Sequence, residues 1–499
     1  MDPMQNYDVI VIGKGNAALC AAISARDAGA RVAMLEAASE DESGGNSRFA
    51  GGVMRFAYHS VEDLQRVTDL TPEDITGSDF GSNTREEFLD TLFEISSYRT
   101  DPDLSEILVT HSLDAMAWLR AKGVRFVLNY GRQSGVVNGR RRFFSGMPIE
   151  VSGGGPGLVQ SLDKAAKAAG IDVFYRTRAL SLCYDGERVS GVRAQREGKA
   201  VEFSAKSVVV ACGGFEANPE WRARYLGPGW ELAKVRGSRF NMGDGLKMAL
   251  EIGAAPYGNW SGCHATGWDR NAPEFGDVSV GDQFQKHSYI FGLLINAAGK
   301  RFVDEGADFH AFTYAKYGGE VLHQPGQFAW QVFDSKVTNL LRSEYRIKLV
   351  TKVTADTLEA LATKLEGVHP QRFLQTAREF NNAVRSDVPF DHTIKDGRGT
   401  IGIEPPKSNW AQALDTPPYH AYCTTCGITF TFGGLRIDRE TGQVKDVHMN
   451  NIPGLYCCGE MVGGLFYFNY PSGTGLVSGT VFGRIAGAGA GRAAVASAS

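Results

Sequence analysis

The chain has 499 residues, of which 43% are hydrophobic and 22% charged, and its formal net charge is −4. This length allows two or three domains with a large core, and the composition is that of a soluble globular protein. The charge excludes a strongly basic nucleic-acid surface, and no apolar run reaches the ~20 residues that span a bilayer. No charged and apolar leader precedes the first expected strand, so we expect a cytoplasmic protein.

The stretch between Tyr7 and Glu36 carries the most specific pattern. Asp8–Ile12 is a short apolar, β-branched run typical of a buried parallel strand, and Arg31–Leu35 is a second such run. Between them a G-x-G-x-x-A turn opens a helix whose alanines form a small-residue face. The residues of this turn are Gly13, Lys14, Gly15, Asn16, Ala17 and Ala18.

Each part of this pattern suits a dinucleotide. Gly13 permits the tight turn, Gly15 lets the backbone approach a pyrophosphate, and Ala18 keeps helix and strand close. The phosphates are expected at the helix N-terminus, near Asn16 and Ala17, because free N–H groups and the helix dipole favour anions there.

Glu36 ends the second strand and is expected to accept hydrogen bonds from a ribose 2′-hydroxyl, which disfavours a 2′-phosphate cofactor. The alternative is a glycine-rich turn in another α/β fold, but strand, turn, helix, strand and acid in this order favour dinucleotide binding. The polar loop Ala37–Gly52 is either a surface loop or a wrap around the cofactor, and its length favours the second interpretation. Its candidate contacts are Gly44, Gly45, Asn46, Ser47, Gly51 and Gly52.

Helical periodicity predicts helices at Arg85–Tyr98 and Asp103–Ala121, whereas Arg140–Arg142 is expected to be a solvated loop. Strands are expected farther along, at Ala179–Cys183 and Ser207–Ala211. The second of these strands ends in glycines, which again favours a cofactor at the carboxyl edge of a sheet. The candidate contacts in this region are Ala179, Gly213, Gly214 and Asp244.

The residue pattern of the sequence changes between residues 255 and 404, where aromatic and polar residues alternate. Glycine and strand patterns return afterwards, so we expect one discontinuous domain of residues 1–254 and 405–499 with an inserted domain of residues 255–404. In its second part, a strand beginning at Leu455 ends in Gly459 and Glu460. A polar stretch before the final helix offers a further place for an oxygen-rich ligand, at Ser472, Gly473, Thr474, Gly475 and Leu476.

The eight cysteines include one C-x-x-C pair, Cys423 and Cys426. A zinc or iron–sulfur site needs about four ligands, and neither a second pair nor a nearby set of histidines accompanies this one. A redox dithiol lacks its usual sequence context as well. We therefore expect buried thiols and no metal site.

Five separated blocks together resemble the flavoprotein subunits of the fumarate reductase and succinate dehydrogenase superfamily. The blocks are Val9–Glu36, Gly44–Gly52, Val208–Gly214, Gly243–Gly245, and Leu455–Gly464 continuing into Ser472–Gly487. This resemblance implies an α/β fold with a discontinuous Rossmann-type FAD-binding domain and an inserted α+β capping domain for the substrate. It also implies that Glu36 holds the adenosine ribose of FAD and Glu460 the ribityl chain, while Ser472–Leu476 lies against the isoalloxazine.

Within this superfamily, the sequence is most similar to FAD-dependent tricarballylate dehydrogenases. The similarity rests on Trp260–His264, Lys286–Tyr289, Phe302–Asp308, Thr313–Lys316, Pro405–Trp410, Thr425–Thr431 and Tyr467–Pro471. It implies oxidation of tricarballylate to cis-aconitate, with electrons passing to a membrane-associated protein or a quinone, and peripheral association with the inner face of the membrane. The flavoprotein domain of a cobalamin-pathway enzyme is also similar, and so are 3-ketosteroid dehydrogenases around Tyr470 and Pro471.

The sequence departs from these families at two places. Fumarate reductases are expected to have a histidine before Gly433–Gly434 and an arginine near Tyr470, and these places are filled here by Phe430–Thr431 and by Tyr470 itself. The tricarballylate pattern has an arginine where His310 stands, and arginine is the side chain best shaped to hold a carboxylate.

Dehydrogenation of a CH–CH bond next to a carboxylate needs a base near the proton and groups that stabilise enolate-like charge. The candidates are His264, His310, Tyr467 and Tyr470. We expect His264 to touch the substrate and a protonated His310 to hold a carboxylate in a pH-dependent way. The alternatives are structural histidines, tyrosines that only pack, an apolar steroid pocket in residues 255–404, and a non-catalytic flavin module that serves a partner.

Overall fold

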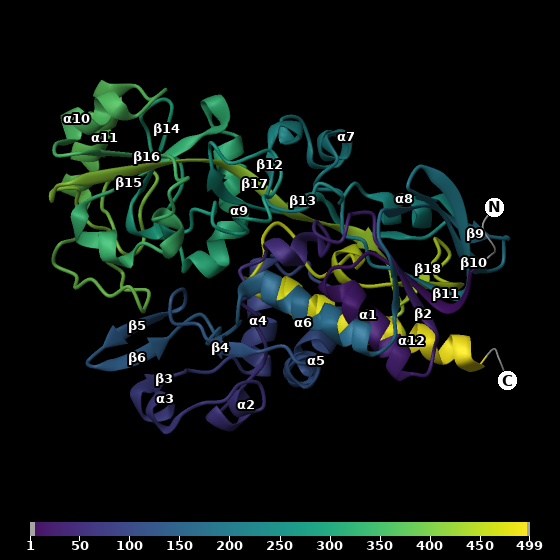
Figure 1. Ribbon diagram of the computed structural model, residues 1–499. Coiled ribbons are helices and arrows are strands. Elements are labelled where there is room, and N and C mark those ends of the chain that lie inside the picture. The colour runs from purple at the N-terminus through teal and green to yellow at the C-terminus, as the bar shows by residue number, and fades with distance from the viewer. Residues whose placement is uncertain (1–4, 497–499) are drawn as a thin grey trace.

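The computed structural model describes residues 5–496, which form two large sheets linked by one long strand (Figure 1). The first sheet has a parallel centre in the order β19-β11-β1-β2-β8, and β18, β9 and β10 add antiparallel strands. Its strands are β1 (Gln5–Ile12), β2 (Val32–Leu35), β8 (Asp172–Phe174), β9 (Thr177–Tyr184), β10 (Val189–Arg196), β11 (Lys199–Val210), β18 (Gln443–Lys445) and β19 (Asn451–Cys457).

The register of this sheet brings three strand ends together. Ile12 pairs with Leu35 on one side and with Val210 on the other, so the carboxyl ends of β1, β2 and β11 share one edge. The run from β1 through α1 (Asn16–Asp27) to β2 is the predicted strand–turn–helix–strand unit. The predicted Rossmann-type fold is confirmed, with its ligand edge at the expected glycines.

The last helix, α12 (Thr474–Ala496), lies directly along α1 (Figure 1). Glycines of α12 face alanines of α1: a Cβ atom at Gly487 would lie 2.1 Å from the carbonyl oxygen of Ala21, and one at Gly483 would lie 2.6 Å from that of Ala17. The small-residue face predicted for α1 therefore packs against this helix. The contact ties the C-terminal part of the chain to the first nucleotide-binding element.

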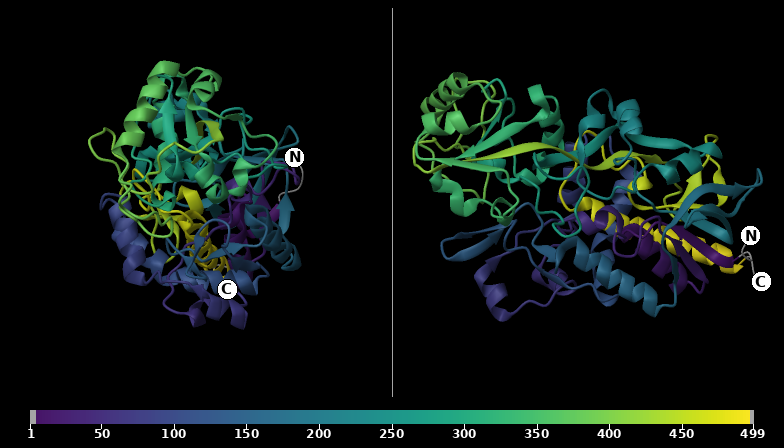
Figure 2. Two further views of the ribbon diagram at one scale, coloured as in Figure 1. Left: turned by 90° about the vertical axis from the view of Figure 1, so that its left-hand side faces the viewer. Right: turned by 45° about the horizontal axis from the view of Figure 1, so that its top comes forward.

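The second sheet covers the other half of the molecule (Figure 2). Its strands are β12 (Lys234–Val235), β13 (Pro256–Asp269), β14 (Leu293–Asn296), β15 (Ala329–Phe333), β16 (Lys352–Ala355) and β17 (Tyr419–Leu435). The helices of this half are α9 (His310–Leu322), α10 (Leu358–Lys364) and α11 (Pro370–Ala383), of which α10 and α11 pack on each other. The short helix α7 (Pro219–Trp221) precedes β12, and α8 (Asp244–Glu251) packs against β9 of the first sheet.

Strand β17 runs from the second sheet into the first half of the molecule (Figure 2). Its first residues, such as Tyr419 and Ala421, belong to the hydrophobic core of the second sheet, whereas Phe432 and Leu435 belong to the core of the first. The expected division after residue 404 therefore precedes a strand that both halves share. The division into 1–254, 255–404 and 405–499 stays a prediction.

The remaining elements lie in the lower part of Figure 1, beneath both halves of the molecule. They are α2 (Val61–Gln65), α3 (Pro72–Gly77), α4 (Arg85–Ile95), α5 (Pro102–Ala121), α6 (Gly154–Ala168), β3 (Ser78–Asp79), β4 (Phe126–Leu128), β5 (Ser134–Val137), β6 (Arg140–Phe143) and β7 (Ile149–Val151). The prediction of a loop at Arg140–Arg142 was wrong. These arginines form β6 against β5, and the guanidinium of Arg141 lies 4.9 Å from the ring centroid of Tyr130.

Cys423 and Cys426 lie buried in β17 as free thiols. Within residues 5–496, no three histidine, cysteine, aspartate or glutamate side chains gather in a way that could hold a metal ion. None of the helices in the same range has the length and apolarity required to cross a bilayer.

Candidate active site

Two adjoining cavities lie where the carboxyl edge of the first sheet meets β17. The cofactor cavity extends from Gly13 and Glu36 to Glu460, and the central cavity continues from Glu460 to His264. Both cavities are lined by Asn16, Ala17, Asn46, Ser47, Gly459 and Glu460. They therefore form one continuous hollow, which residues from both ends of the chain line.

Most of the predicted cofactor contacts line this hollow. Apart from the shared residues, they are Gly13, Gly15, Glu36, Gly45, Ala179, Gly213 and Asp244 in the cofactor cavity, and Gly51, Gly52, Ser472, Gly473, Gly475 and Leu476 in the central cavity. Ala18 and Thr474 do not line it because both are fully buried in their helices. Gly44 turns the loop against Val159 with a φ of 114°, and Gly214 lies behind Glu460.

The cofactor cavity fits the phosphate and ribose part of a dinucleotide. A Cβ atom at Gly13 would lie 2.5 Å from the carbonyl oxygen of Ala211, so only glycine leaves this turn in place. The backbone N–H of Asn16 donates to Ser47 Oγ at 3.0 Å, which holds the loop against the start of α1. Glu36 lies buried at the end of β2 and faces the same cavity. This donor set and its glycines are those that a pyrophosphate and a 2′-hydroxyl require.

Asn46 lines both cavities, but its amide is mostly occupied by the protein. Nδ2 donates to Glu216 Oε1 at 2.6 Å and to the carbonyl oxygen of Thr429 at 2.5 Å, and Oδ1 accepts from the N–H of Ser238 at 2.7 Å. The side chain therefore fastens the loop to β17. Both N–H groups and one acceptor position of the amide are used in this way, so Oδ1 keeps one position for a ligand, and the contact of Asn46 with the cofactor stays a prediction.

Three arginines from separate segments line the central cavity. Arg132 follows β4, Arg236 follows β12, and Arg342 lies between two short 3-10 helices. Arg236 is buried, and its Nε donates to Asp282 Oδ1 at 2.7 Å. Arg132 is held more loosely, at 3.7 Å from Asp282 Oδ2 and 3.7 Å from Glu344 Oε1. The three arginines outnumber the two carboxyl groups, Asp282 and Glu344, that lie within 4 Å of them in the described residues, so this region carries more cationic than anionic groups.

Arg342 has no carboxylate partner within ion-pair distance in residues 5–496. Its Nη2 donates to the carbonyl oxygen of Arg132 at 3.1 Å and to His310 Nε2 at 2.5 Å. Gln133 Nε2 lies 3.2 Å from the same ring nitrogen. Burial lowers the pKa of Arg342 because the cation has lost water, and the neighbouring charge of Glu344 opposes this shift only in part.

His310 is brought into the central cavity, but in a different role from the predicted one. Burial lowers its pKa well below the ordinary value, and the positive charges of Arg342 and Arg132 lower it further. Its Nε2 accepts from Arg342, so the neutral imidazole positions a guanidinium. The expectation of a protonated His310 that holds a carboxylate is thus corrected: Arg342 provides the cation at this place.

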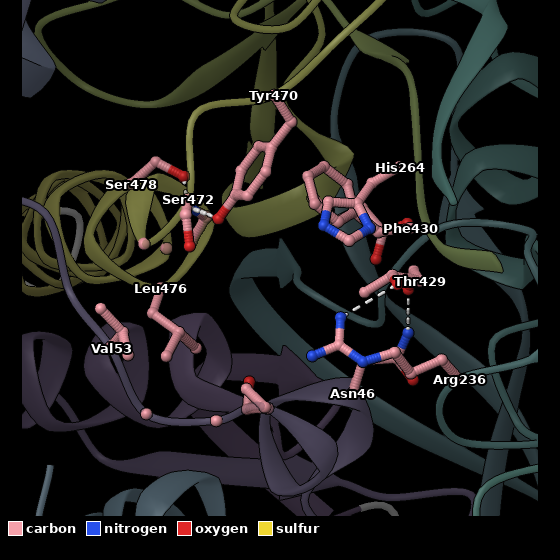
Figure 3. A pocket seen from close by; sticks show the side chains of 18 of the residues that line it. Asn46, Val53, Arg236, His264, Thr429, Phe430, Tyr470, Ser472, Leu476 and Ser478 are labelled. Atoms are coloured by element: carbon pink, nitrogen blue, oxygen red, sulfur yellow. Dashed lines mark hydrogen bonds between the residues drawn. The ribbon is translucent and has the colours of Figure 1, made fainter. Parts of the chain in front are cut away.

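His264 also lines the central cavity, as predicted, and its ring lies between Tyr470 and Arg236 in Figure 3. The ring stacks on Phe430 with centroids 5.4 Å apart and meets the ring of Tyr470 edge-on at 4.9 Å. Burial and the charge of Arg236 lower its pKa well below the ordinary value, so the imidazole is neutral. Its Nδ1 is buried and bonded to no described residue, which leaves a ring nitrogen available to a ligand.

The two predicted tyrosines differ in position. Tyr470 lines the central cavity, and its hydroxyl oxygen accepts from the backbone N–H of Gly475 at 2.6 Å, in the first turn of α12. Burial raises the pKa of Tyr470, so it is a neutral hydroxyl that retains a proton to donate. Tyr467 does not line the cavity. The chain turns at Phe468, whose φ is 62°, and Tyr467 lies half-buried on the opposite side of the segment from Phe466 and Tyr470.

The comparison with known proteins follows this geometry. The family described as FAD binding domain matches residues 8–476, and the chain belongs to it. More particularly, it is a flavoprotein of the fumarate reductase and succinate dehydrogenase superfamily, and FAD is its cofactor. The hollow described above, with its glycine turn and buried Glu36, fits that cofactor.

Three relatives illustrate the range of this superfamily. The chain is 30% identical over 490 residues to the "Fumarate reductase (cytochrome)" of Shewanella frigidimarina, covering 97% of this chain and 77% of that protein. It is 28% identical over 349 residues to the "3-oxosteroid 1-dehydrogenase" of Mycobacterium tuberculosis, covering 65% and 60%. The solved open conformation of a flavocytochrome c3 fumarate reductase superposes with a TM-score of 0.73 at 26% identity, covering 99% of this chain and 79% of that one. The chain is therefore an FAD-dependent oxidoreductase.

Sequence reasoning missed the polar side chains that the β4–β5 connection and the second sheet with its loops bring to the central cavity. They are Arg132, Gln133, Arg236, Asp282, Gln285, His287, Tyr314 and Arg342. His287 pairs with Thr266 through Nε2 and Oγ1 at 2.5 Å, and its pKa is lowered by burial. None of these residues lies in a periodic pattern, and the available signals were the positions of His287 and Tyr314 inside the matched blocks Lys286–Tyr289 and Thr313–Lys316.

Proposed function

We propose that this flavoprotein oxidises a CH–CH bond next to a carboxylate, and that its substrate is tricarballylate, which becomes cis-aconitate. The observation that carries this proposal is the set of three arginines, Arg132, Arg236 and Arg342, around the central cavity. Guanidinium groups bind carboxylates through short, often bidentate hydrogen bonds. A site with three guanidinium groups and only two nearby carboxyl groups, Asp282 and Glu344, suits a substrate with several negative charges.

The three arginines differ in how much of their charge is already compensated. Arg236 is paired with Asp282 at 2.7 Å, and Arg132 shares that carboxylate only at 3.7 Å. Arg342 has no carboxylate within ion-pair distance among the described residues, and its hydrogen bonds use Nη2 alone. A carboxylate of the substrate therefore gains most at Arg342, because the anion nearest to that cation does not contact it.

The residues near Tyr470 suit the proton chemistry of the reaction. The substrate loses a proton from one carbon, and FAD, when bound, supplies the two-electron acceptor for hydride from its neighbour. His264, neutral and with an unbonded ring nitrogen, is positioned to accept the proton. The bound carboxylates offset the charge of Arg236 and so raise the pKa of His264 toward the range of an effective base. Tyr470 donates a hydrogen bond and orients the substrate.

The reduced enzyme must pass its electrons on, and we propose a membrane-associated protein or a quinone as the acceptor. Support comes from the superfamily, since one relative is named for its cytochrome. A quinone analogue, a soluble cytochrome and oxygen should be compared as oxidants of the substrate-reduced protein. Fast reoxidation by oxygen alone would contradict this part of the proposal.

The decisive experiment is anaerobic mixing of the holoenzyme with tricarballylate, succinate, citrate or a 3-ketosteroid while flavin absorbance is followed. Loss of absorbance with tricarballylate, and slower loss with succinate, is the expected result. Bleaching by the steroid alone would overturn the carboxylate proposal. Inertness to all four compounds would favour the alternative of a flavin module that serves a partner protein.

Fumarate reduction is the second candidate, because it uses the same carboxylate contacts in the opposite direction and the fumarate reductase relative is 30% identical. The positions at which a histidine and an arginine are expected in that activity hold Phe430 and Tyr470. Oxidation of a reduced viologen dye by fumarate, measured beside tricarballylate oxidation, separates the two directions. A faster rate with fumarate would make reduction the preferred assignment.

A further inference from the structure

A buried arginine lies directly behind the wall of the central cavity, next to the start of α12. Arg55 is only 1% exposed. Its Nε donates to the carbonyl oxygen of Ser472 at 3.1 Å, and its Nη1 lies 3.4 Å from Asn83 Oδ1. Its Nη2 is buried and has no hydrogen-bond partner within residues 5–496. One side of this guanidinium is therefore fixed to the cavity wall, whereas the other side is left unsatisfied.

The charge of Arg55 is not neutralised by any carboxylate within ion-pair distance in the described part of the chain. The guanidinium packs instead on aromatic rings, 5.1 Å from the centroid of Phe312 and 6.0 Å from that of Phe88. Burial lowers the pKa of Arg55 to about 10, which leaves it a cation at neutral pH. The titratable groups that face it are the tyrosines Tyr58, Tyr314 and Tyr470. An unpaired buried cation destabilises a fold, so its presence here favours a functional role.

Arg55 also sets the direction of a backbone donor in the cavity wall. The guanidinium holds the carbonyl group of Ser472, and the backbone N–H of Arg55 donates to the carbonyl oxygen of Gly473 at 3.0 Å. The Ser472–Gly473 peptide is trans, so the N–H of Gly473 points opposite to that carbonyl, away from Arg55. Gly473 lines the central cavity, and its N–H donates to no other group in residues 5–496.

The neighbouring N–H groups are already used. That of Thr474 donates to the carbonyl oxygen of Pro471 at 3.3 Å, and that of Gly475 donates to the hydroxyl oxygen of Tyr470. Only glycine allows this arrangement at position 473, because its φ is 83° and a Cβ atom would lie 2.8 Å from the backbone nitrogen of Arg55. The wall therefore presents one free donor with a buried cation behind it.

The position of the cofactor cavity indicates what this donor faces. The phosphate and ribose part of FAD fits the cavity that ends at Glu460, so the isoalloxazine ring belongs in the central cavity beyond it. Ser472 and Leu476 lie on the opposite side of that cavity from Arg236 in Figure 3. One side of the cavity thus serves the flavin, and the other side carries the three arginines described above.

We propose that Arg55 is a positioning residue that raises the reduction potential of the bound flavin, because it holds the Gly473 N–H toward the ring and adds a buried positive charge behind it. Transfer of hydride breaks a C–H bond of the donor and forms an N–H bond on the neutral flavin. The electron pair that moves with it leaves a negative charge on the ring. A donor and a cation fixed beforehand in a dry site stabilise this charge more than they stabilise the neutral oxidised ring.

The test is the midpoint potential of the holoenzyme, measured without substrate by equilibration with reference dyes during slow reduction. Arg55→Met should weaken the binding of reduced relative to oxidised flavin about tenfold, which for this two-electron couple lowers the potential by about 30 mV. Arg55→Lys keeps the charge and should restore most of this loss. Because FAD is the only ligand involved, the measurement can fail while the proposed substrate stands, and the reverse also holds.

Sulfite gives a second readout. It forms an S–N bond with the oxidised flavin, and the adduct carries a negative charge on the ring as the reduced flavin does. The dissociation constant of sulfite, measured from the loss of flavin absorbance, should therefore rise about tenfold in Arg55→Met and much less in Arg55→Lys.

Arg85→Met is the matched control, because it removes the same charge from an exposed position on α4 and should leave both readouts unchanged. Equal potentials in Arg55→Met and the wild type, with FAD bound in both, would overturn the proposal. So would an equal decrease in Arg55→Met and Arg55→Lys, since packing and not charge would then set the potential. If neither variant folds, the wild type decides: a potential at or below that of free FAD contradicts the proposal.

Discussion

Replacing Arg342 by leucine removes the one cavity arginine that lacks an ion-pair partner among the described residues. The hydrogen bonds of this guanidinium involve Nη2, so Nε and Nη1 are available to a carboxylate. Hydrogen bonds to charged groups contribute about 1.5–3 kcal/mol each. A loss of about 3 kcal/mol corresponds to a decrease of about 150-fold in kcat/KM for tricarballylate.

The measurement is the rate of anaerobic flavin reduction as a function of tricarballylate concentration. Arg346→Leu is the matched control, because Arg346 lies four residues away and is exposed. FAD occupancy after purification should be the same in both variants and in the wild type. With an analogue that lacks one terminal carboxylate, Arg342→Leu should lower kcat/KM by a smaller factor, because the analogue has already lost the contact that the substitution removes. An unchanged kcat/KM in Arg342→Leu would refute the assignment of this cation to the substrate.

Three further changes test other parts of the site. Tyr470→Phe should slow flavin reduction by substrate at least tenfold while FAD stays bound, because the neutral hydroxyl donor is lost, and an unaltered rate would remove Tyr470 from the mechanism. Glu36→Ala should raise the dissociation constant of FAD about 10- to 100-fold, as expected for loss of a hydrogen bond to a carboxylate, and full occupancy would contradict that contact. In the wild type, the buried His310 stays neutral below about pH 6.5, whereas the unfolded chain binds a proton there, so the free energy of unfolding decreases by up to about 1.4 kcal/mol per pH unit. His310→Gln removes this group, so its stability should decrease less steeply as the pH is lowered. Thermal unfolding from pH 7 to 5.5 measures this slope, exposed His59→Gln is the control, and equal slopes in His310→Gln and the wild type would contradict it.

The nucleotide-binding half could be predicted because its signals are local. The turn at Gly13 and the acid at Glu36 lie within one strand–helix–strand unit. Glycine is needed at position 13 because a Cβ atom there would collide with the backbone of Ala211. Glu460 and Ser472 were also found, since each precedes or follows a clear apolar element.

The substrate side could not be read in the same way. Arg132, Arg236 and Arg342 come from three separate loops that meet only in the folded chain, and no spacing in the sequence connects them. The role of His310 changed for the same reason, because its partner is 32 residues away. Long-range pairing also defines β17, whose glycines and aromatic residues do not show a regular strand pattern.

The continuity of β17 has a mechanical consequence. A hydrogen-bonded strand transmits displacement along its length, so movement of the second sheet relative to the first has to twist or shift this strand. The carbonyl oxygen of Thr429 in β17 accepts a hydrogen bond from Asn46 Nδ2, and the backbone N–H of Thr431, two residues later, donates to Glu460 Oε1. A movement of the second sheet that shifts β17 and its paired strand β13 would thus reach the residues around Glu460 along the backbone. If bound substrate raises the affinity for FAD by some factor, thermodynamic linkage requires that bound FAD raises the affinity for substrate by the same factor.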